Sequence, residues 1–213
     1  MADSKTPHGR SESAQEEVCK ILRKANVVEF GTFKLSSGRV TPYYVDLRVI
    51  PSFPDAFRLV SDIFVNAIRD DLGLESFERV AGIPTAGTPF ASILAYHLNK
   101  PFLYIRQQPR LRGRERRIEG LLMPGNRVLL IDDLITTGLS LKKAALTIRA
   151  EGGVVSDAFV ILDREEGGKE RLAEIGVNLH SVLRMEKAAR KLYEMNAIAE
   201  DELKTILSQL KMK

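Results

Sequence analysis

The chain has 213 residues, 44% of them hydrophobic and 28% charged, with a formal net charge of +4 and a sequence pI of about 9.2. This length and apolar content suffice for one packed core and are short for two full domains. The positive balance suits an anionic ligand and equally permits weak nucleic-acid binding, so charge alone does not separate an enzyme from a nucleic-acid-binding protein.

Residue composition argues against a disulfide-bonded, zinc-binding, membrane-spanning or secreted protein. Cys19 is the only cysteine, which rules out an internal disulfide and a cysteine zinc cluster, and the three histidines are too scattered to predict a metal site. No apolar segment is long enough to span a bilayer, and the polar start Met1 to Glu12 lacks the apolar centre of a secretory signal. We therefore expect a cytoplasmic protein.

The first part of the chain predicts a tail, a helix and a strand. Met1 to about Ser13 is polar and indicates a flexible tail, and apolar residues at helical spacing then predict a helix over Ala14 to Ala25. From Phe33 to Arg48 (FKLSSGRVTPYYVDLR), a polar turn containing Ser36 precedes residues that alternate as in a strand, with Tyr43 on one face and Tyr44 on the other. By itself this segment is consistent with an ordinary loop and edge strand.

Apolar runs alternate with helical patterns through the middle of the chain and predict a parallel sheet. The runs are Arg79 to Ile83, Pro101 to Ile105, Val128 to Ile131, Ala158 to Leu162 and Leu179 to Val182, and Met185 to Lys213 then has the pattern of helices.

Two of the connections carry features suited to pyrophosphate. VAGIPTAGTPFA, from Val80 to Ala91, is a strand followed by a turn with Thr85, Ala86 and Gly87, which can present N–H groups to an anion or be a plain strand-to-helix connection. Between Tyr104 and Gly120 six arginines crowd together, which is typical either of a solvated basic loop or of a lid that closes over pyrophosphate. These arginines are Arg106, Arg110, Arg112, Arg114, Arg116 and Arg117.

The strongest motif is VLLIDDLITTGLS, from Val128 to Ser140. Asp132 and Asp133 follow a buried parallel strand, at the edge of the sheet where ligands bind, and a helix is predicted from Leu141 to Glu151. The loop between them offers hydroxyl and N–H groups to a phosphate, while the carboxylates suit hydroxyl donors or Mg²⁺, so a ribose 5-phosphate fits. The alternative is that the two aspartates only cap a turn.

A last polar segment, LDREEGG, follows the strand that ends at Ile161. Arg164 is either a ligand-binding residue or half of a surface ion pair with Glu165 or Glu166, which would contribute little to stability.

Residues 128–140 resemble the 5-phosphoribosyl 1-pyrophosphate (PRPP) motif of the type I phosphoribosyltransferases, and the segments 33–48, 104–120 and 162–168 resemble those of orotate phosphoribosyltransferases. The matches follow the family order over most of residues 30 to 170. The resemblance implies an α/β fold with a central parallel sheet flanked by helices and a small N-terminal hood. It implies one domain over residues 1–213, with a tail at 1–13, a hood at about 14–50, a core at about 51–184 and C-terminal helices at 185–213.

The resemblance also assigns roles to residues. Catalysis would involve Arg110, Asp132 and Asp133, and orotate would contact Ser36, Tyr44, Thr136 and Arg164. PRPP would bind Thr85, Ala86, Gly87, Arg106, Arg110, Arg112, Asp132, Asp133, Thr136, Thr137, Gly138, Leu139 and Ser140.

The chain departs from the family pattern at four positions. Gln107 and Arg110 stand where many members have lysines, Arg112 where they commonly have histidine, and Ala86 where some have lysine. Arginine can stabilise a departing pyrophosphate but cannot readily act as an acid, so electrostatic help is retained and proton transfer is not.

By this resemblance the chain joins orotate to the phosphoribosyl group of PRPP with Mg²⁺ held mainly by PRPP, and with Asp132 or Asp133 as its candidate protein ligands. A homodimer that shares the Arg106 to Gly120 loop is also implied, and we expect no membrane and no specific nucleic-acid partner. Two alternatives stay open: a phosphoribosyltransferase for another base, and a non-enzymatic nucleic-acid-binding regulator on the same fold.

Overall fold

The structure is a computed structural model that describes residues 12–34, 38, 40–106 and 117–211. Its helices are α1 (Glu12–Lys24), η1 (3-10, Leu47–Ser52), α2 (Pro54–Asp71), α3 (Gly87–Leu98), α4 (Leu139–Ala150), α5 (Gly168–Ala173), α6 (Met185–Glu194) and α7 (Glu200–Lys211). Its strands are β1 (Val28–Lys34), β2 (Val40–Val45), β3 (Arg79–Gly82), β4 (Phe102–Ile105), β5 (Ile118–Glu119), β6 (Arg127–Ile135), β7 (Val154–Asp163) and β8 (Asn178–Arg184).

The predicted parallel sheet is confirmed. Six strands lie in the order β5-β4-β3-β6-β7-β8, and the five that arise from the predicted apolar runs are mutually parallel. The short edge strand β5, which no apolar run signalled, pairs antiparallel with β4. Because β4 and β5 flank residues 106–117, their pairing brings the two ends of this segment together.

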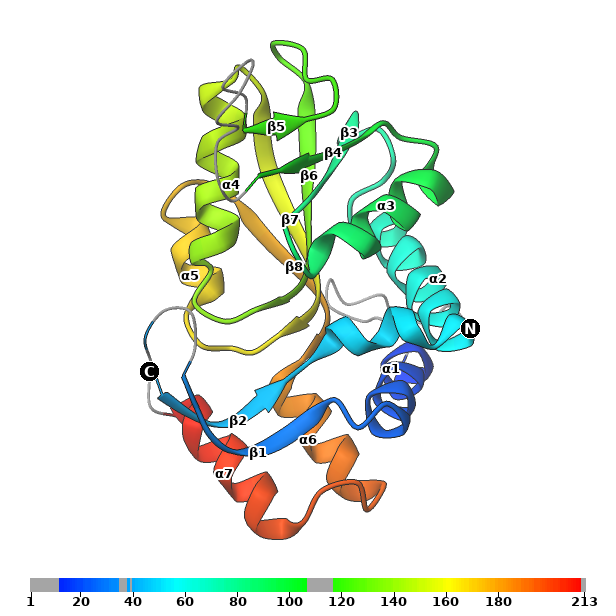
Figure 1. The fold of residues 1–213 in the computed structure, drawn as a ribbon, viewed down its shortest axis with the longest axis vertical. Coiled ribbons are helices and arrows are strands. Elements are labelled where there is room, and N and C mark those ends of the chain that lie inside the picture. The colour runs from blue at the N-terminus through cyan, green and yellow to red at the C-terminus, as the bar shows by residue number, and fades with distance from the viewer. Residues whose placement is uncertain (1–11, 35–37, 39, 107–116, 212–213) are drawn as a thin grey trace, which may run out of the picture.

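Helices cover both faces of the sheet, with α2 and α3 on one side and α4 and α5 on the other (Figure 1). Phe64 of α2 and Phe159 of β7 are fully buried with ring centroids 5.3 Å apart, and on the opposite face Ile148 of α4 packs in a second cluster with Leu130. Burial on both faces explains why the strands are continuously apolar. None of the described helices is long and apolar enough to cross a membrane.

Strand β6 is longer than its apolar run. Pairing with β7 continues past Ile131, with Asp132 opposite Val160 and Ile135 opposite Asp163. The two aspartates follow the apolar run and lie within the carboxyl end of β6, as predicted, and the backbone ladder continues past them through the edge of the core.

The N-terminal segments form a separate layer. Strands β1 and β2 make an antiparallel hairpin, here called the hood hairpin, which lies with α1, α6 and α7 at one end of the sheet (Figure 1). The alternation predicted up to Arg48 ends earlier, because Asp46 accepts a hydrogen bond from the N–H of Arg48 and caps η1. Helix α1 starts at Glu12, within the predicted tail, and residues 1–11 lie outside the described part. The proposed limits of hood, core and C-terminal helices stay predictions.

A buried charged group joins the hood hairpin to the core. The Arg164 guanidinium is 1% exposed, lies 2.8 Å from the Glu166 carboxylate and 4.4 Å from the Tyr43 ring centroid, and donates to the Thr41 hydroxyl at 3.2 Å. Burial raises the pKa of Tyr43 to about 12, so its phenol stays neutral and donates to Glu166. Because both charges have lost their hydration, each depends on the other.

We expect Glu166→Gln to lower the free energy of unfolding by about 3–5 kcal/mol, since it leaves the Arg164 charge buried without its carboxylate. The double variant Arg164→Met/Glu166→Gln should lose less. Urea unfolding measures both, and Arg190→Met, which breaks an exposed pair with Glu186, is the control with an expected loss below about 1 kcal/mol. A double variant less stable than Glu166→Gln would contradict the account.

Candidate active site

The candidate site lies where β3 and β6 end side by side. These neighbouring strands lead into α3 and α4, which cover opposite faces of the sheet (Figure 1). Such a switch in direction opens a crevice at the carboxyl edge of a parallel sheet. The structure brings together at this edge the two loops that the sequence marked as anion-binding, 83–87 and 136–140.

Asp132 and Asp133 lie in the carboxyl-terminal part of β6, at this edge, and are 8% and 7% exposed. The N–H of Asp133 donates to Asp132 Oδ1 at 3.0 Å, and the N–H of Leu134 donates to Asp133 Oδ1 at 2.8 Å. Burial and then the neighbouring charge of Asp133 hold the pKa of Asp132 well above its ordinary value, and burial also raises the pKa of Asp133. The pair is therefore costly to keep ionised and is suited to a cation or to hydroxyl donors.

Gly87 explains how the first loop approaches these carboxylates. A Cβ added at Gly87 would lie 2.6 Å from the Ile131 carbonyl oxygen and 2.7 Å from Asp132 Oδ1, so only glycine fits. Thr85 and Ala86 form the turn before it, with Thr85 exposed to the crevice edge. The first turn of α3 is thus packed directly on Asp132.

The second loop, 136–140, follows β6 and opens α4. Gly138 has a φ of +75°, and a Cβ there would lie 3.0 Å from the carbonyl oxygen of Gly168. Thr136 and Thr137 are half-buried, and Leu139 and Ser140 are the exposed first residues of α4. Free N–H groups at this helix start and the flanking hydroxyls can hold a phosphate.

A cationic cavity of about 310 Å³ adjoins both loops. It is lined by Pro84 of the first loop, Ser140 of the second, and Arg106 at the end of β4, which pairs with Glu119 at 2.8 Å. Arg117 and Lys143 line it as well: Arg117 belongs to the arginine-rich segment that the sequence marked as a possible lid, and no sequence motif singled out Lys143. The predicted residues Gln107, Arg110 and Arg112 lie outside the described residues.

The predicted orotate contacts are only partly placed. Ser36 lies outside the described residues, Thr136 is in the crevice loop, and Tyr44 accepts a hydrogen bond from Arg48 at 2.9 Å. Arg164 is not in a surface pair: its ion pair with Glu166 exists but is fully buried under the hood hairpin. Its contact with orotate stays a prediction.

Sequence reasoning also missed Arg48. Two of its guanidinium nitrogens donate to the Asp46 carboxylate at 2.7 and 2.8 Å, which orients the side chain, and its positive charge acts to lower the pKa of Asp133. The alternation of residues 43–48 could not reveal this, because the turn into η1 redirects the side chain.

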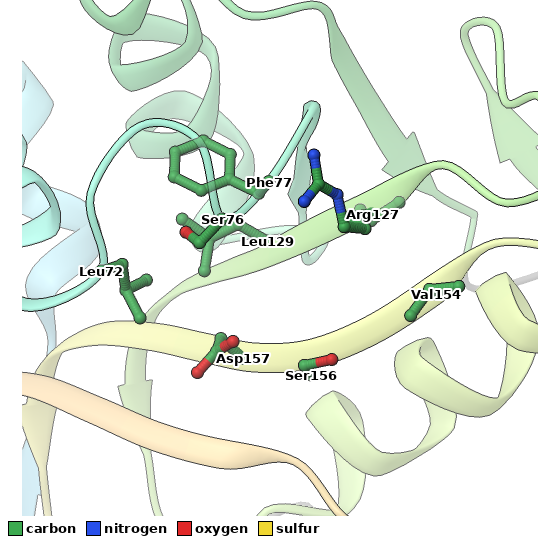
Figure 2. Close-up of a pocket in the computed structure, with 9 residues that line it drawn as sticks. Leu72, Ser76, Phe77, Arg127, Leu129, Val154, Ser156 and Asp157 are labelled. Carbon is green, nitrogen blue, oxygen red and sulfur yellow. The ribbon is translucent and has the colours of Figure 1, made fainter.

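Figure 2 shows a second hollow at the opposite, amino-terminal edge of the sheet, where Arg127 begins β6 and Val154 begins β7. Its volume is about 10 Å³, room for about one water molecule. A substrate does not fit there, so the carboxyl edge holds the candidate site.

The residues fit a magnesium ion that is bound mostly by a ligand. Asp132 and Asp133 supply hard oxygens, and no group of three or more metal-binding side chains occurs within the described ranges. Mg²⁺ is usually held by one or two carboxylates together with substrate phosphates.

We expect Asp132→Asn to raise the melting temperature by roughly 2–4 °C at pH 8, the shift that about 1 kcal/mol produces in a chain of this size. Because the folded-state pKa of Asp132 is raised, its ionisation costs stability as pH rises through that value, and the gain should shrink as pH falls below it. Thermal unfolding from pH 5 to 8 measures this, with exposed Asp62→Asn as control. A gain independent of pH would refute the explanation.

Comparison with known proteins places this geometry in a family. Residues 52–178 match the phosphoribosyl transferase domain. Orotate phosphoribosyltransferases of Sulfolobus acidocaldarius and Cenarchaeum symbiosum are 41% and 40% identical, over 88% and 87% of this chain and 92% of each relative.

Solved structures agree. Orotate phosphoribosyltransferase from Aeropyrum pernix has a TM-score of 0.72 at 35% identity, covering 83% of this chain and 99% of that one. UMP synthase from Leishmania donovani has a TM-score of 0.84 at 32% identity over 94% of this chain, which spans only 43% of that longer protein. With its two buried aspartates, phosphate loop and cationic cavity at the switch point, the chain belongs to the orotate phosphoribosyltransferases, within the family of phosphoribosyl transferase domains.

Proposed function

We propose that the crevice transfers the 5-phosphoribosyl group of PRPP to orotate, giving orotidine 5′-monophosphate and pyrophosphate in pyrimidine synthesis. The observation that carries the proposal is the meeting of Asp132 and Asp133 with loop 136–140 and the cationic cavity at one edge. One ligand with ribose hydroxyls, a 5-phosphate and a diphosphate matches all three.

Each group then has one task. Loop 136–140 holds the 5-phosphate, Asp132 and Asp133 hold the ribose hydroxyls, and Arg106 with residues 85–87 faces the diphosphate. Orotate N1 forms the bond to ribose C1 and gives up its proton as the C1–O bond breaks; the electron pair of the C1–O bond leaves with pyrophosphate, and the proton passes to pyrophosphate or to water. The sugar becomes cationic in the transition state, by analogy with glycoside cleavage. The protein contributes alignment and charge neutralisation and needs no nucleophile.

Mg²⁺ is part of this proposal. When bound to PRPP it would neutralise charge on the leaving diphosphate. Asp132 and Asp133, whose ionised forms are disfavoured by burial, would hold its shell or the ribose hydroxyls.

Orotate is favoured over other bases because the relatives at 35–41% identity are named orotate phosphoribosyltransferases or, in one case, uridine 5′-monophosphate synthase. A Mycobacterium tuberculosis orotate phosphoribosyltransferase with a TM-score of 0.64 has been solved in complex with PRPP. We further propose that the protein works in the cytoplasm without a specific nucleic-acid partner, as the single cysteine and modest net charge favour.

The test is the loss of orotate absorbance with purified protein, PRPP and Mg²⁺, with adenine, hypoxanthine and uracil in parallel. We expect turnover of orotate alone, stopped by EDTA and restored by Mg²⁺. Turnover of a different base would replace the substrate assignment. PRPP binding without turnover of any base would favour the regulator.

We also propose a homodimer that shares the Arg106 to Gly120 loop: Arg106 and Arg117, at the two ends of this segment, line the cavity of their own subunit, and Arg110 serves the site of the neighbouring subunit. Asp132→Asn damages the crevice and Arg110→Ala damages the loop, so each variant alone should be nearly inactive. Mixing them through unfolding and refolding should restore about a quarter of the wild-type activity, since half of the dimers are mixed and each has one intact site. A mixture no more active than its parents would place each loop in its own subunit.

A further inference from the structure

The walls of the cationic cavity come from two unrelated parts of the chain. On one side, β4 and β5 carry Arg106 and Arg117, and the backbone N–H of Arg106 donates to the carbonyl oxygen of Arg117 at 2.7 Å. On the other side stands α4, with Ser140, Lys143 and Thr147 facing the cavity. The cavity volume of about 310 Å³ is at the lower end of the range for small-molecule sites.

Helix periodicity explains why Lys143 reaches this space. Ser140, Lys143 and Thr147 are three and four residues apart, so they form one stripe along α4. Ser140 is the last residue of the phosphate loop, and Lys143 follows one turn further along the same stripe. The ammonium group therefore borders the same space as the loop.

Lys142, which precedes Lys143 on α4, behaves differently. Lys142 points away from this cavity and pairs with Glu174 of α5 at 2.9 Å. For Lys143 and Arg117 no ion pair with a described residue is found, and none of the described residues that line the cavity is an aspartate or glutamate. Arg106 has a carboxylate partner within the described part of the chain, Glu119.

Three cations around one cavity repel one another, which raises the electrostatic free energy of the folded protein. The β4–β5 ladder fixes Arg106 beside Arg117, so the chain cannot relieve the repulsion there by separating their backbones. A bound polyanion removes it, and charge-assisted hydrogen bonds from arginine and lysine to phosphate oxygens are among the stronger polar contacts.

We infer that Lys143 and Arg117 bind the diphosphate group of PRPP, and of the pyrophosphate released from it, in this cavity. The inference rests on the proposed function and adds Lys143, which no motif marks, and Arg117, to which the resemblance gives no role of its own. Loop 136–140 would hold the 5-phosphate, so the two ends of PRPP would be bound by different residues. Lys143 and Arg117 would also supply positive charge near the first loop, where Ala86 carries none.

The test compares Lys143→Gln with Lys142→Gln, two neutralised lysines on adjacent positions of α4. We expect Lys143→Gln to raise the KM for PRPP and the inhibition constant of pyrophosphate about tenfold, the effect of one lost charge-assisted hydrogen bond. The KM for orotate and inhibition by ribose 5-phosphate, which has no diphosphate, should not change. Arg117→Gln should behave in the same way, and Lys143→Arg should retain most of the affinity.

Calorimetric titration with pyrophosphate alone separates this inference from the proposed function, because it needs no turnover. Weaker pyrophosphate binding in Lys143→Gln, with Lys142→Gln like wild type, supports the inference even if orotate is not the substrate. Equal effects of the two lysine variants would overturn it. A loss of ribose 5-phosphate inhibition in Lys143→Gln would also overturn it, by assigning Lys143 to the 5-phosphate. Failure of wild type to convert orotate would reject only the proposed function.

Discussion

The structure depends on one electrostatic constraint, the burial of two adjacent carboxylates at the end of a central strand. Asp132 and Asp133 lie where hydration is lost, and the charge of Asp133 further opposes ionisation of Asp132. Nearby groups reduce the cost of burying the two carboxylates. Backbone N–H groups donate to them, Gly87 lets α3 approach them, and Arg48 adds a positive charge nearby. The part of the burial cost that these contacts do not offset can be offset by a bound ligand that donates hydroxyl groups or carries a cation. Stability lost at this point is available as ligand affinity, which is the usual relation between active-site strain and function.

A second buried charge performs a different task. Arg164 and Glu166 attach the hood hairpin to the core through Thr41 and Tyr43, contacts between residues more than a hundred positions apart. The polar segment that follows β7 thus fixes the position of the hood hairpin relative to the sheet.

Much of the architecture could be predicted, because a continuously apolar strand and the polar residues that follow it can be recognised in a short stretch of sequence. All five apolar runs became parallel strands, and the loops after two of them meet at the switch point. Three features could not be predicted from local signals. The pairing of β6 with β7 through Asp132 depends on the ladder, the burial of Arg164 depends on a distant hairpin, and the difference between Lys142 and Lys143 depends on the rotational phase of α4 against the cavity. Each is set by tertiary packing, which composition and periodicity do not encode.

The contact between Gly138 and Gly168 has a consequence for protein engineering. A Cβ on Gly138 would touch the backbone of Gly168, and a Cβ on Gly168 would lie 2.6 Å from the Ile135 side chain and 2.8 Å from the Thr136 carbonyl oxygen. The phosphate loop and the LDREEGG segment therefore interlock, backbone against backbone. An exchange of residues 163–168 would therefore also reshape loop 136–140, so the two segments would have to be transplanted together.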